Sequence, residues 1–338
     1  MGAIRIPAPI SGGLLLSYKC SAECRHCMYA CSPKWEGWIS GEDLRTILSL
    51  LAGRIKESPY GSDYVSLNHG LHFTGGEPFL NFDLLLDAVR MANDLNIPST
   101  FVETNCYWCV NDNITREKLL KLKERGLKGI LISVNPFFLE YVPFERTERC
   151  VRISRETFQE NMMIYQFEYY FRFKKMGIAG TVSLEEYMNA EKESLPANVE
   201  LFLMGRAAYK LNHLYPKHPP DHFFEEPCQT PFLRKWHNHF DNYGNFMPGY
   251  CGGLSLGNWR NLDKLLEEGI EYSKYPILGF IVKQDFEGLF RFAKDFVFQE
   301  SSEGYVSKCA FCVDVRRHLQ SKKEFIELQP EEFYSHLE

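Results

Sequence analysis

Several features are missing from this sequence of 338 residues. It contains no apolar run long enough to cross a bilayer, and its first residues lack the apolar segment of a signal peptide. It also lacks an excess of basic residues, because the formal net charge is −6, whereas nucleic-acid-binding surfaces are usually basic overall. No internal repeat and no low-complexity segment is present. These absences predict a globular cytoplasmic protein with no membrane and no nucleic-acid partner.

Cysteine, by contrast, is abundant, with 11 residues that fall largely in tight groups. In a secreted chain such a number would predict disulfides. Without an export signal, metal ligation is the better interpretation. The remaining composition, 45% hydrophobic and 24% charged, is that of an ordinary globular protein, and the length suffices for two domains.

Residues 13 to 212 alternate between short apolar runs and amphipathic segments, which predicts an α/β fold with a parallel sheet. Ligands of such sheets gather at the carboxyl ends of the strands. Asn81 and Thr115 are predicted helix N-caps, and Gly126 and Gly177 predicted helix ends. The predicted strands are Gly13–Tyr18, Val65–Phe73, Pro98–Glu103, Gly129–Val134, Ile178–Ser183 and Val199–Met204. The predicted helices are Gly41–Ile55, Phe82–Asn93, Thr115–Arg125, Glu156–Met176 and Leu184–Ser194.

Three cysteines, Cys20, Cys24 and Cys27, follow the first predicted strand with the spacing C-x-x-x-C-x-x-C. A cubane iron–sulfur cluster normally takes four thiolates, so a loop that offers three leaves one iron open to a substrate or cofactor. A structural zinc ion with a distant fourth ligand is the alternative. Cys31 could close a four-cysteine cluster, but in bacterial ferredoxins the cysteine after an x3 gap ligates a different cluster.

The segment Thr74-Gly75-Gly76-Glu77-Pro78 follows the second predicted strand, and with the cysteine triad it resembles the radical S-adenosylmethionine (radical SAM) superfamily. The resemblance implies a partial (β/α)6, TIM-like barrel over residues 1–215. It also implies a [4Fe–4S] cluster whose open iron is chelated by SAM, with Gly75, Gly76, Glu77 and Pro78 at the methionine moiety of SAM. Glu77 would accept hydrogen bonds from its amine, and the glycines would let the ligand approach the backbone.

Polar residues also end other predicted strands. The resemblance implies that such positions contact the ribose or carboxylate of SAM, and that the segment around Arg206 faces the adenine. Ordinary strand-end turns or a surface salt bridge are the alternatives. The residues concerned are Thr104, Asn105, Ser133, Asn135 and Arg206.

The C-terminal part holds Cys228, Cys251, Cys309 and Cys312, enough thiolates for a second [4Fe–4S] cluster. Residues 240–253, predicted to contain a short hairpin, resemble the auxiliary-cluster extensions of radical SAM proteins, called SPASM with two clusters and Twitch with one. With four cysteines, a Twitch-like domain over 216–338 is the better match. A structural zinc ion is the alternative. Two helices, Asn261–Glu268 and Ile277–Lys283, are predicted within this domain.

The other cysteines are Cys31, Cys106, Cys109 and Cys150. The stretch from Cys24 to Cys31 shows a short resemblance to radical SAM peptide epimerases, in which a thiol donates a hydrogen atom to the substrate radical. Cys31 and Cys106, which follow the first and third predicted strands, are the candidate donors. Packing against neighbouring aromatic side chains is the alternative for all four thiols.

Together these features predict a radical SAM enzyme that takes a hydrogen atom from its substrate. Modification of a peptide or protein, such as epimerisation or crosslinking, is the leading interpretation. Dehydrogenation of a small molecule is the second. A two-cluster electron carrier is the alternative outside enzymes. The expected partners are the peptide or small-molecule substrate and a reductant of the flavodoxin or ferredoxin type.

Overall fold

The computed structural model describes residues 3–190, 201–228 and 231–338. The chain forms two compact units. We call the first the sheet unit; it comprises Pro9–Cys24 and the chain from Cys31 to residue 190. We call the second the C-terminal unit; it comprises the chain from Leu201 onward, the segment that ends at Ala8, and Arg25–Ala30. None of the helices in the described part of the chain combines the length and apolarity that a bilayer crossing requires.

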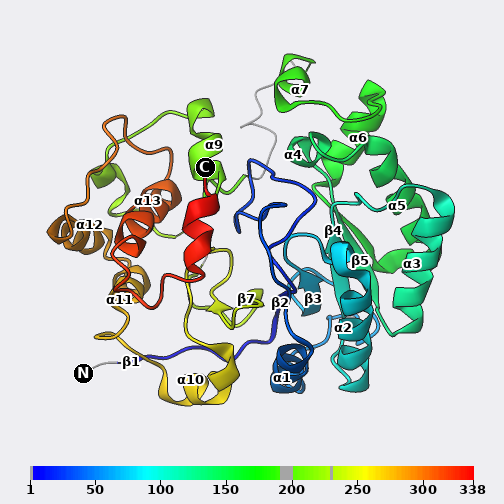
Figure 1. Cartoon of the computed structure of the whole chain (residues 1–338), viewed down its shortest axis with the longest axis horizontal. Coiled ribbons are helices and arrows are strands. Elements are labelled where there is room, and N and C mark those ends of the chain that lie inside the picture. Colours follow the sequence, from blue (N-terminus) through cyan, green and yellow to red (C-terminus); the bar gives the residue numbers. More distant parts are fainter. Residues whose placement is uncertain (1–2, 191–200, 229–230) are drawn as a thin grey trace. The chain divides into compact units, whose positions relative to one another are not determined.

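The sheet unit is built on five parallel strands in the order β6-β5-β4-β3-β2 (Figure 1). The register is continuous, with Leu15 opposite Thr74 and Ile132 opposite Ile164. The strands β2, β3 and β5 are buried almost throughout, as expected for a parallel sheet covered by helices. The strands are β2 (Ser11–Leu15), β3 (Gly70–Thr74), β4 (Phe101–Thr104), β5 (Gly129–Ser133) and β6 (Met162–Tyr165).

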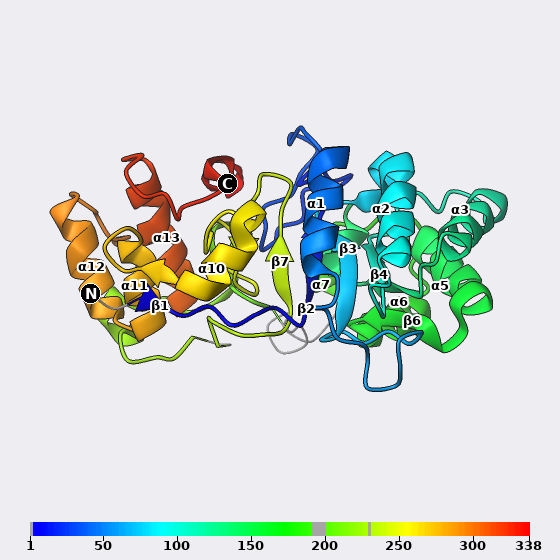
Figure 2. The same ribbon diagram turned by 90° about the horizontal axis from the view of Figure 1, so that it is seen from below.

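Amphipathic helices connect these strands. In α1 the buried residues Leu44, Ile47, Leu48 and Leu51 recur at helical spacing, so one stripe of the helix lies against the core. Figure 2 shows α1, α2 and α3 side by side along one side of the strands. The helical elements are α1 (Gly41–Leu51), η1 (Pro78–Asn81), α2 (Phe82–Asp94), α3 (Asp112–Glu124), α4 (Pro136–Leu139), α5 (Phe144–Phe158), η2 (Gln159–Asn161), α6 (Phe167–Met176) and α7 (Leu184–Ala190).

The predicted parallel α/β fold is confirmed, but the region after β5 differs from the prediction. The predicted helix Glu156–Met176 is wrong, because β6 lies in its middle, between left-handed residues at Gln159 (φ 55°) and Gln166 (φ 61°) that end α5 and begin α6. The predicted strand Ile178–Ser183 is irregular chain; its Gly180 has φ 72°. Strand pairing with β5 therefore overrode local helical periodicity.

The remaining predictions for the sheet unit concern one strand, the end of one helix and two helix N-caps. Residues 201–204 of the predicted strand Val199–Met204 form no strand, and its first two residues lie outside the described chain. Residues 191–194 of the predicted helix Leu184–Ser194 also lie outside the described chain. Asn81 caps α2 as predicted. Thr115 is not a cap, because the side chain of Asn111 accepts the hydrogen bond from the backbone N–H of Ile114 and α3 begins earlier.

The C-terminal unit combines short strands with helices. Its N-terminal strand β1 (Ala3–Ile4) pairs antiparallel with β9 (Ile270–Glu271). The predicted hairpin is confirmed as β7 (Asn238–Phe240) and β8 (Phe246–Met247), with Asp241 Oδ1 accepting from Tyr243 and Asn245 in the turn. The other elements are α9 (Ala207–Lys210), η3 (Asn212–Leu214), η4 (Pro220–Phe223), η5 (Trp259–Asn261), α10 (Leu262–Glu268), α11 (Pro276–Lys283), α12 (Phe286–Asp295), α13 (Lys308–Gln320) and η6 (Glu331–His336).

Candidate functional site

The predicted cysteine loop begins where β2 ends. The backbone N–H of Cys20 donates to the carbonyl of Ser32 (3.0 Å), which closes the two ends of the loop. Cys20 and Cys24 belong to the sheet unit and are buried. The side-chain amide of Asn105 lies 3.7 Å from the sulfur of Cys20 and donates toward it. Amide N–H groups aimed at ligand sulfurs are typical of iron–sulfur sites, where they set the reduction potential.

Cys27 lies in the segment that belongs to the C-terminal unit. Its carbonyl accepts hydrogen bonds from the backbone N–H groups of Ala30 (3.3 Å) and Arg206 (3.1 Å). The guanidinium of Arg206 is buried and donates to the carbonyls of Ala30 (2.7 Å) and His336 (3.2 Å). Arg206, predicted to face the adenine, thus holds the segment that carries Cys27, and the surface salt bridge considered for it is wrong.

The segment Thr74–Pro78 folds directly against the entry to the cysteine loop. The N–H of Gly76 donates to the carbonyl of Ser17 (2.8 Å), and the N–H of Glu77 to that of Lys19 (3.0 Å). A Cβ atom on Gly75 would lie 2.2 Å from the carbonyl oxygen of Ser17, and one on Gly76 would lie 2.0 Å from that of Lys19. The glycines are therefore required by the approach of two backbone segments of this chain, and their role at a bound ligand stays a prediction.

The side chain of Glu77, within this segment, is fully buried. Its carboxylate accepts hydrogen bonds from the hydroxyl of Thr104 (3.0 and 3.1 Å) and from the backbone N–H groups of Asn105 (2.8 Å) and Phe79 (3.2 Å). Burial outweighs these hydrogen bonds and raises the pKa of Glu77 to about 8. Thr104, Asn105 and Glu77, all predicted to contact SAM, thus form one hydrogen-bonded network. Because burial makes the anion costly, a cation beside this carboxyl would be strongly favoured.

Glu103 belongs, with Thr104 and Asn105, to the polar end of a predicted strand for which the resemblance implies contacts with SAM, and the structure gives it partners that the sequence did not predict. Its carboxylate accepts a hydrogen bond from the hydroxyl of Thr74 (2.7 Å) and lies 3.6 Å from Nε2 of His72. Burial raises its pKa to about 7, while its side chain remains 25% exposed. Alternation along β3 and β4 puts these three side chains on one face of the sheet. That His72 and Thr74 lie beside Glu103 could be inferred only once the register of β3 and β4 was known.

Ser133 ends β5, and Asn135, two residues further on, has a structural role. Its side-chain oxygen caps α4 by accepting from the backbone N–H groups of Phe137 (3.1 Å) and Phe138 (3.2 Å), and its amide nitrogen donates to Gln166 (3.1 Å). The side chain of Asn135 is buried, whereas Ser133 is partly exposed. A role of either residue at SAM stays a prediction.

The candidate hydrogen-atom donors are both buried in the sheet unit. Cys106 follows β4 and lies with Cys109 and Cys150, their three sulfur atoms within 4.8 Å of one another. Burial raises the pKa of Cys106 well above its usual value, so this thiol is protonated at neutral pH. A protonated thiol carries the hydrogen atom that a donor must supply.

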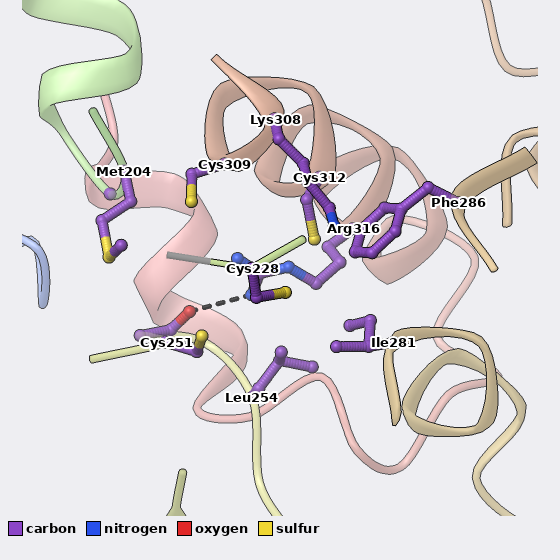
Figure 3. Close-up of a pocket in the computed structure, with 12 residues that line it drawn as sticks. Met204, Cys228, Cys251, Leu254, Ile281, Phe286, Lys308, Cys309, Cys312 and Arg316 are labelled. Carbon is purple, nitrogen blue, oxygen red and sulfur yellow. Dashed lines mark hydrogen bonds between the residues drawn. The ribbon is translucent and has the colours of Figure 1, made fainter. Parts of the chain in front are cut away.

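All four C-terminal cysteines line one pocket of the C-terminal unit, and Figure 3 shows their sulfur atoms pointing into it. Cys309 and Cys312 lie within the first two turns of α13, which Ser307 caps. Cys251 follows β8, and the N–H of Cys228 donates to the side chain of Gln284 (2.9 Å). The rest of the wall is formed by residues of several elements: Met204, Gly205, Gly252, Leu254, Ile281, Phe286, Lys308 and Arg316.

Two cations accompany these thiols. Arg316 is buried and donates to the carbonyl of Gly252 (2.8 Å) and the hydroxyl of Tyr334 (3.2 Å), while its Nε has no partner among the described residues. The ammonium of Lys308 lies 3.6 Å from the ring centre of Phe286. Burial raises the pKa of Cys251 to about 12. Empty, the pocket would hold neutral thiols beside a buried guanidinium, whereas four thiolates around a metal cluster would offset the charge of both cations.

No protein-family model and no curated protein sequence matches the chain. Similar solved structures include BtrN in complex with AdoMet and 2-DOIA, at 13% identity over 85% of this chain and 91% of that one, with a TM-score of 0.49. Histidine-tagged anSMEcpe with bound AdoMet is similar at 14% identity over 93% and 97%, with a TM-score of 0.46. Native anSMEcpe with bound AdoMet and Cp18Cys peptide is similar at 14% identity over 93% and 97%, with a TM-score of 0.42. These similarities are too low to assign a family.

Proposed function

We propose that the chain is a radical SAM enzyme with one auxiliary iron–sulfur cluster. The observation that carries the proposal is the packing of Gly75, Gly76 and Glu77 against the entry to the cysteine loop, at the carboxyl ends of β2 and β3. This edge of a parallel sheet is where ligands bind. We assign residues 1–215 to a catalytic core with the architecture of a partial (β/α)6 barrel, and residues 216–338 to a smaller Twitch-like domain.

In this proposal Cys20, Cys24 and Cys27 hold the catalytic [4Fe–4S] cluster. When bound, the cluster supplies the electron that cleaves SAM to methionine and a 5′-deoxyadenosyl radical, which takes a hydrogen atom from the substrate. The chain's own groups orient the reactants. Glu77 offers a buried carboxylate to the amine of SAM, and Asn105 donates toward the sulfur of Cys20. Gly75, Gly76, Pro78, Thr104, Ser133, Asn135 and Arg206 are the further proposed SAM-binding positions.

The direct test is release of 5′-deoxyadenosine. The anaerobically reconstituted chain, given SAM and a strong reductant without any substrate, is expected to form this product slowly, as followed by chromatography and mass spectrometry. A two-cluster iron–sulfur electron carrier has no use for a SAM pocket. A protein that binds iron–sulfur clusters but neither binds nor cleaves SAM would therefore be such a carrier, and the enzyme proposal would be wrong.

The C-terminal pocket is proposed to hold the second [4Fe–4S] cluster through Cys228, Cys251, Cys309 and Cys312. The convergence of four thiols with the buried Arg316 supports this choice over neutral packing. A structural zinc ion is the competing occupant, since it takes the same thiolates.

A double variant, Cys309→Ser with Cys312→Ser, separates cluster from zinc at this second site. We expect total iron to fall from about eight to about four atoms per chain, because each complete cubane holds four irons. The measurement is metal analysis of the reconstituted protein beside a Cys31→Ser control, which should keep all eight. Loss of one zinc ion with unchanged iron would reject the auxiliary cluster while leaving the catalytic one intact.

The substrate is proposed to be a peptide or protein, with dehydrogenation of a small molecule as the second candidate. The substrate radical can end in two ways. In epimerisation a thiol, Cys31 or Cys106, gives its hydrogen atom to the carbon, and the resulting thiyl radical must then regain an electron and a proton from the reductant. In oxidation the substrate radical loses an electron and a proton; a cluster held by Cys228, Cys251, Cys309 and Cys312 would be the electron acceptor, and solvent would take the proton.

Heavy water distinguishes these outcomes. If a thiol ends the radical, the product carbon is expected to gain one deuterium in D₂O, because thiol protons exchange with solvent. If the radical is oxidised, that carbon gains none. Mass spectrometry of the product gives the answer. Full turnover in both the Cys31→Ala and the Cys106→Ala variants would exclude these two residues as donors.

A further inference from the structure

Three buried thiols outside the proposed cluster sites converge in the sheet unit. Cys106 and Cys109 come from the turn after β4, and Cys150 comes from the middle of α5. Their sulfur atoms all lie within 4.8 Å of one another, and none of the three residues is exposed to solvent. Because Cys150 lies far from Cys106 and Cys109 in the sequence, the fold and not a local motif brings these thiols together. We call this group the three-thiol cluster.

The backbone is shaped to present the two turn cysteines together. The N–H of Cys109 donates to the carbonyl of Cys106 (3.0 Å), which closes the turn, and Cys106 adopts φ 69°. A left-handed backbone is costly for a residue with a Cβ and persists only where the surroundings enforce it. Arg149, from α5, donates to the carbonyl of Cys109 (2.6 Å), and Arg146 donates to the carbonyl of Tyr107. Two arginines thus fasten the turn to the helix that carries Cys150.

The spacing of the sulfurs fits one metal ion. With zinc–sulfur bonds of about 2.3 Å in a tetrahedral site, ligand sulfurs lie about 3.8 Å apart. A cubane cluster spreads its thiolates over separate irons and would not fit sulfurs so close together. Neutral thiols at these positions would be polar groups with only one another and nearby hydroxyls as partners, namely Ser154, 3.8 Å from the sulfur of Cys150, and Thr115 beside Cys109.

We propose that Cys106, Cys109 and Cys150 bind a single Zn²⁺ ion, a structural site distinct from both proposed iron–sulfur clusters. Three thiols lose their protons and one dication enters, so the site carries one net negative charge. The guanidinium groups of Arg146 and Arg149, on α5, donate to carbonyls of the same turn. Arg149 also pairs with Asp112, so Arg146 contributes most to offsetting this charge. The hydroxyl of Ser154 can donate to the thiolate of Cys150. Zinc leaves less uncompensated charge here than the univalent Cu⁺. A bound ion would also remove Cys106 from the candidate hydrogen-atom donors and leave Cys31.

The test uses the full-length protein, reconstituted with iron and washed with a chelator. We expect one zinc ion per chain in the parent and in a Cys31→Ala control. In the triple variant Cys106→Ala, Cys109→Ala, Cys150→Ala the ion is expected to be absent while the iron content stays as in the parent. Because the C-terminal pocket could itself take zinc, the outcome is the difference between parent and triple variant: loss of one zinc ion with unchanged iron. A zinc ion in the C-terminal pocket adds equally to both proteins, so a failure of the iron–sulfur proposal does not imitate a failure of this one.

If the triple variant does not fold, X-ray absorption at the zinc edge of the parent protein still tests the site, because it reports the atoms bound to the ion. We expect three sulfur neighbours at about 2.3 Å. A zinc content that is the same in the parent and in a folded triple variant, or the absence of zinc from the parent, would overturn the site. So would a parent mass two hydrogens lower under non-reducing denaturing conditions, which would reveal a disulfide among these thiols. Copper in place of zinc would overturn the choice of ion.

Discussion

Replacing Cys20, Cys24 and Cys27 together with alanine is expected to abolish release of 5′-deoxyadenosine and to lower the iron content from about eight to about four atoms per chain. The three residues share one proposed cubane, and no smaller number of thiolates holds it. The remaining iron would stay with the C-terminal cysteines, which line a pocket of their own. Iron analysis and product assay on the same anaerobic preparation measure both effects.

The matched control for this variant is Cys31→Ala, which removes a buried thiol just after the same loop. It should retain about eight irons and release 5′-deoxyadenosine, because Cys31 is not proposed as a ligand. If iron is lost in the control as well as in the triple variant, Cys31 closes a conventional four-cysteine cluster with the other three residues, and the open-iron interpretation is wrong. An unchanged iron content in the triple variant would reject the first cluster altogether.

The sequence predicted the elements whose local pattern agrees with their long-range contacts. Strands β2 to β5 and helices α1 to α3 follow apolar runs and stripes that their neighbours reinforce. Strand β6 was missed because the helical periodicity predicted over Glu156–Met176 runs through Met162–Tyr165. It is a strand because Ile130 and Ile132 pair with it across the sheet. A single sequence does not contain that pairing.

The candidate site shows the same division. The cysteine triad and the Gly-Gly-Glu-Pro segment were evident because each is contiguous. The partners of Glu103, His72 and Thr74, are known only once the register of β3 and β4 is known. Cys150 joins Cys106 and Cys109 only because α5 packs against the turn after β4. The reason for the two glycines was also beyond the sequence. It lies in the distances to Ser17 and Lys19, which are set by the packing of two loops.

Glu77→Gln is expected to weaken SAM binding by about 1.5–3 kcal/mol, the range for a hydrogen bond to a charged group, which corresponds to roughly a tenfold to hundredfold higher Kd. Glutamine keeps the size of the side chain and resembles the protonated acid, so the network with Thr104 and Asn105 can persist. Iron content should not change. Equilibrium binding of SAM to the reconstituted parent and variant measures the effect, and equal affinities would show that the amine of SAM lies elsewhere.

The pH dependence of binding follows from the raised pKa of Glu77, about 8 in the protein without SAM against an ordinary 4.5. Below pH 8 this carboxyl is protonated. A bound cation favours the carboxylate, so binding expels a proton, and the SAM affinity contributed by this group should rise with pH up to about 8 and then level off, by at most about tenfold per pH unit. In stability the sign is opposite. Burial of the neutral acid stabilises the SAM-free fold below pH 4.5, and this contribution is lost as pH rises through 8.

Both dependences should disappear in Glu77→Gln, since the amide does not titrate. The matched control is Glu103→Gln, which removes another buried carboxyl with a raised pKa, about 7, but lies outside the Gly-Gly-Glu-Pro segment. Ionisation of SAM itself is common to all three proteins and cancels in the comparison. The expected result is a rise in affinity between pH 6 and 8 that is present in the parent and in Glu103→Gln and is missing in Glu77→Gln. If the rise instead vanishes with Glu103→Gln, the carboxyl that meets the cation of SAM is Glu103, and Glu77 only holds the end of β4.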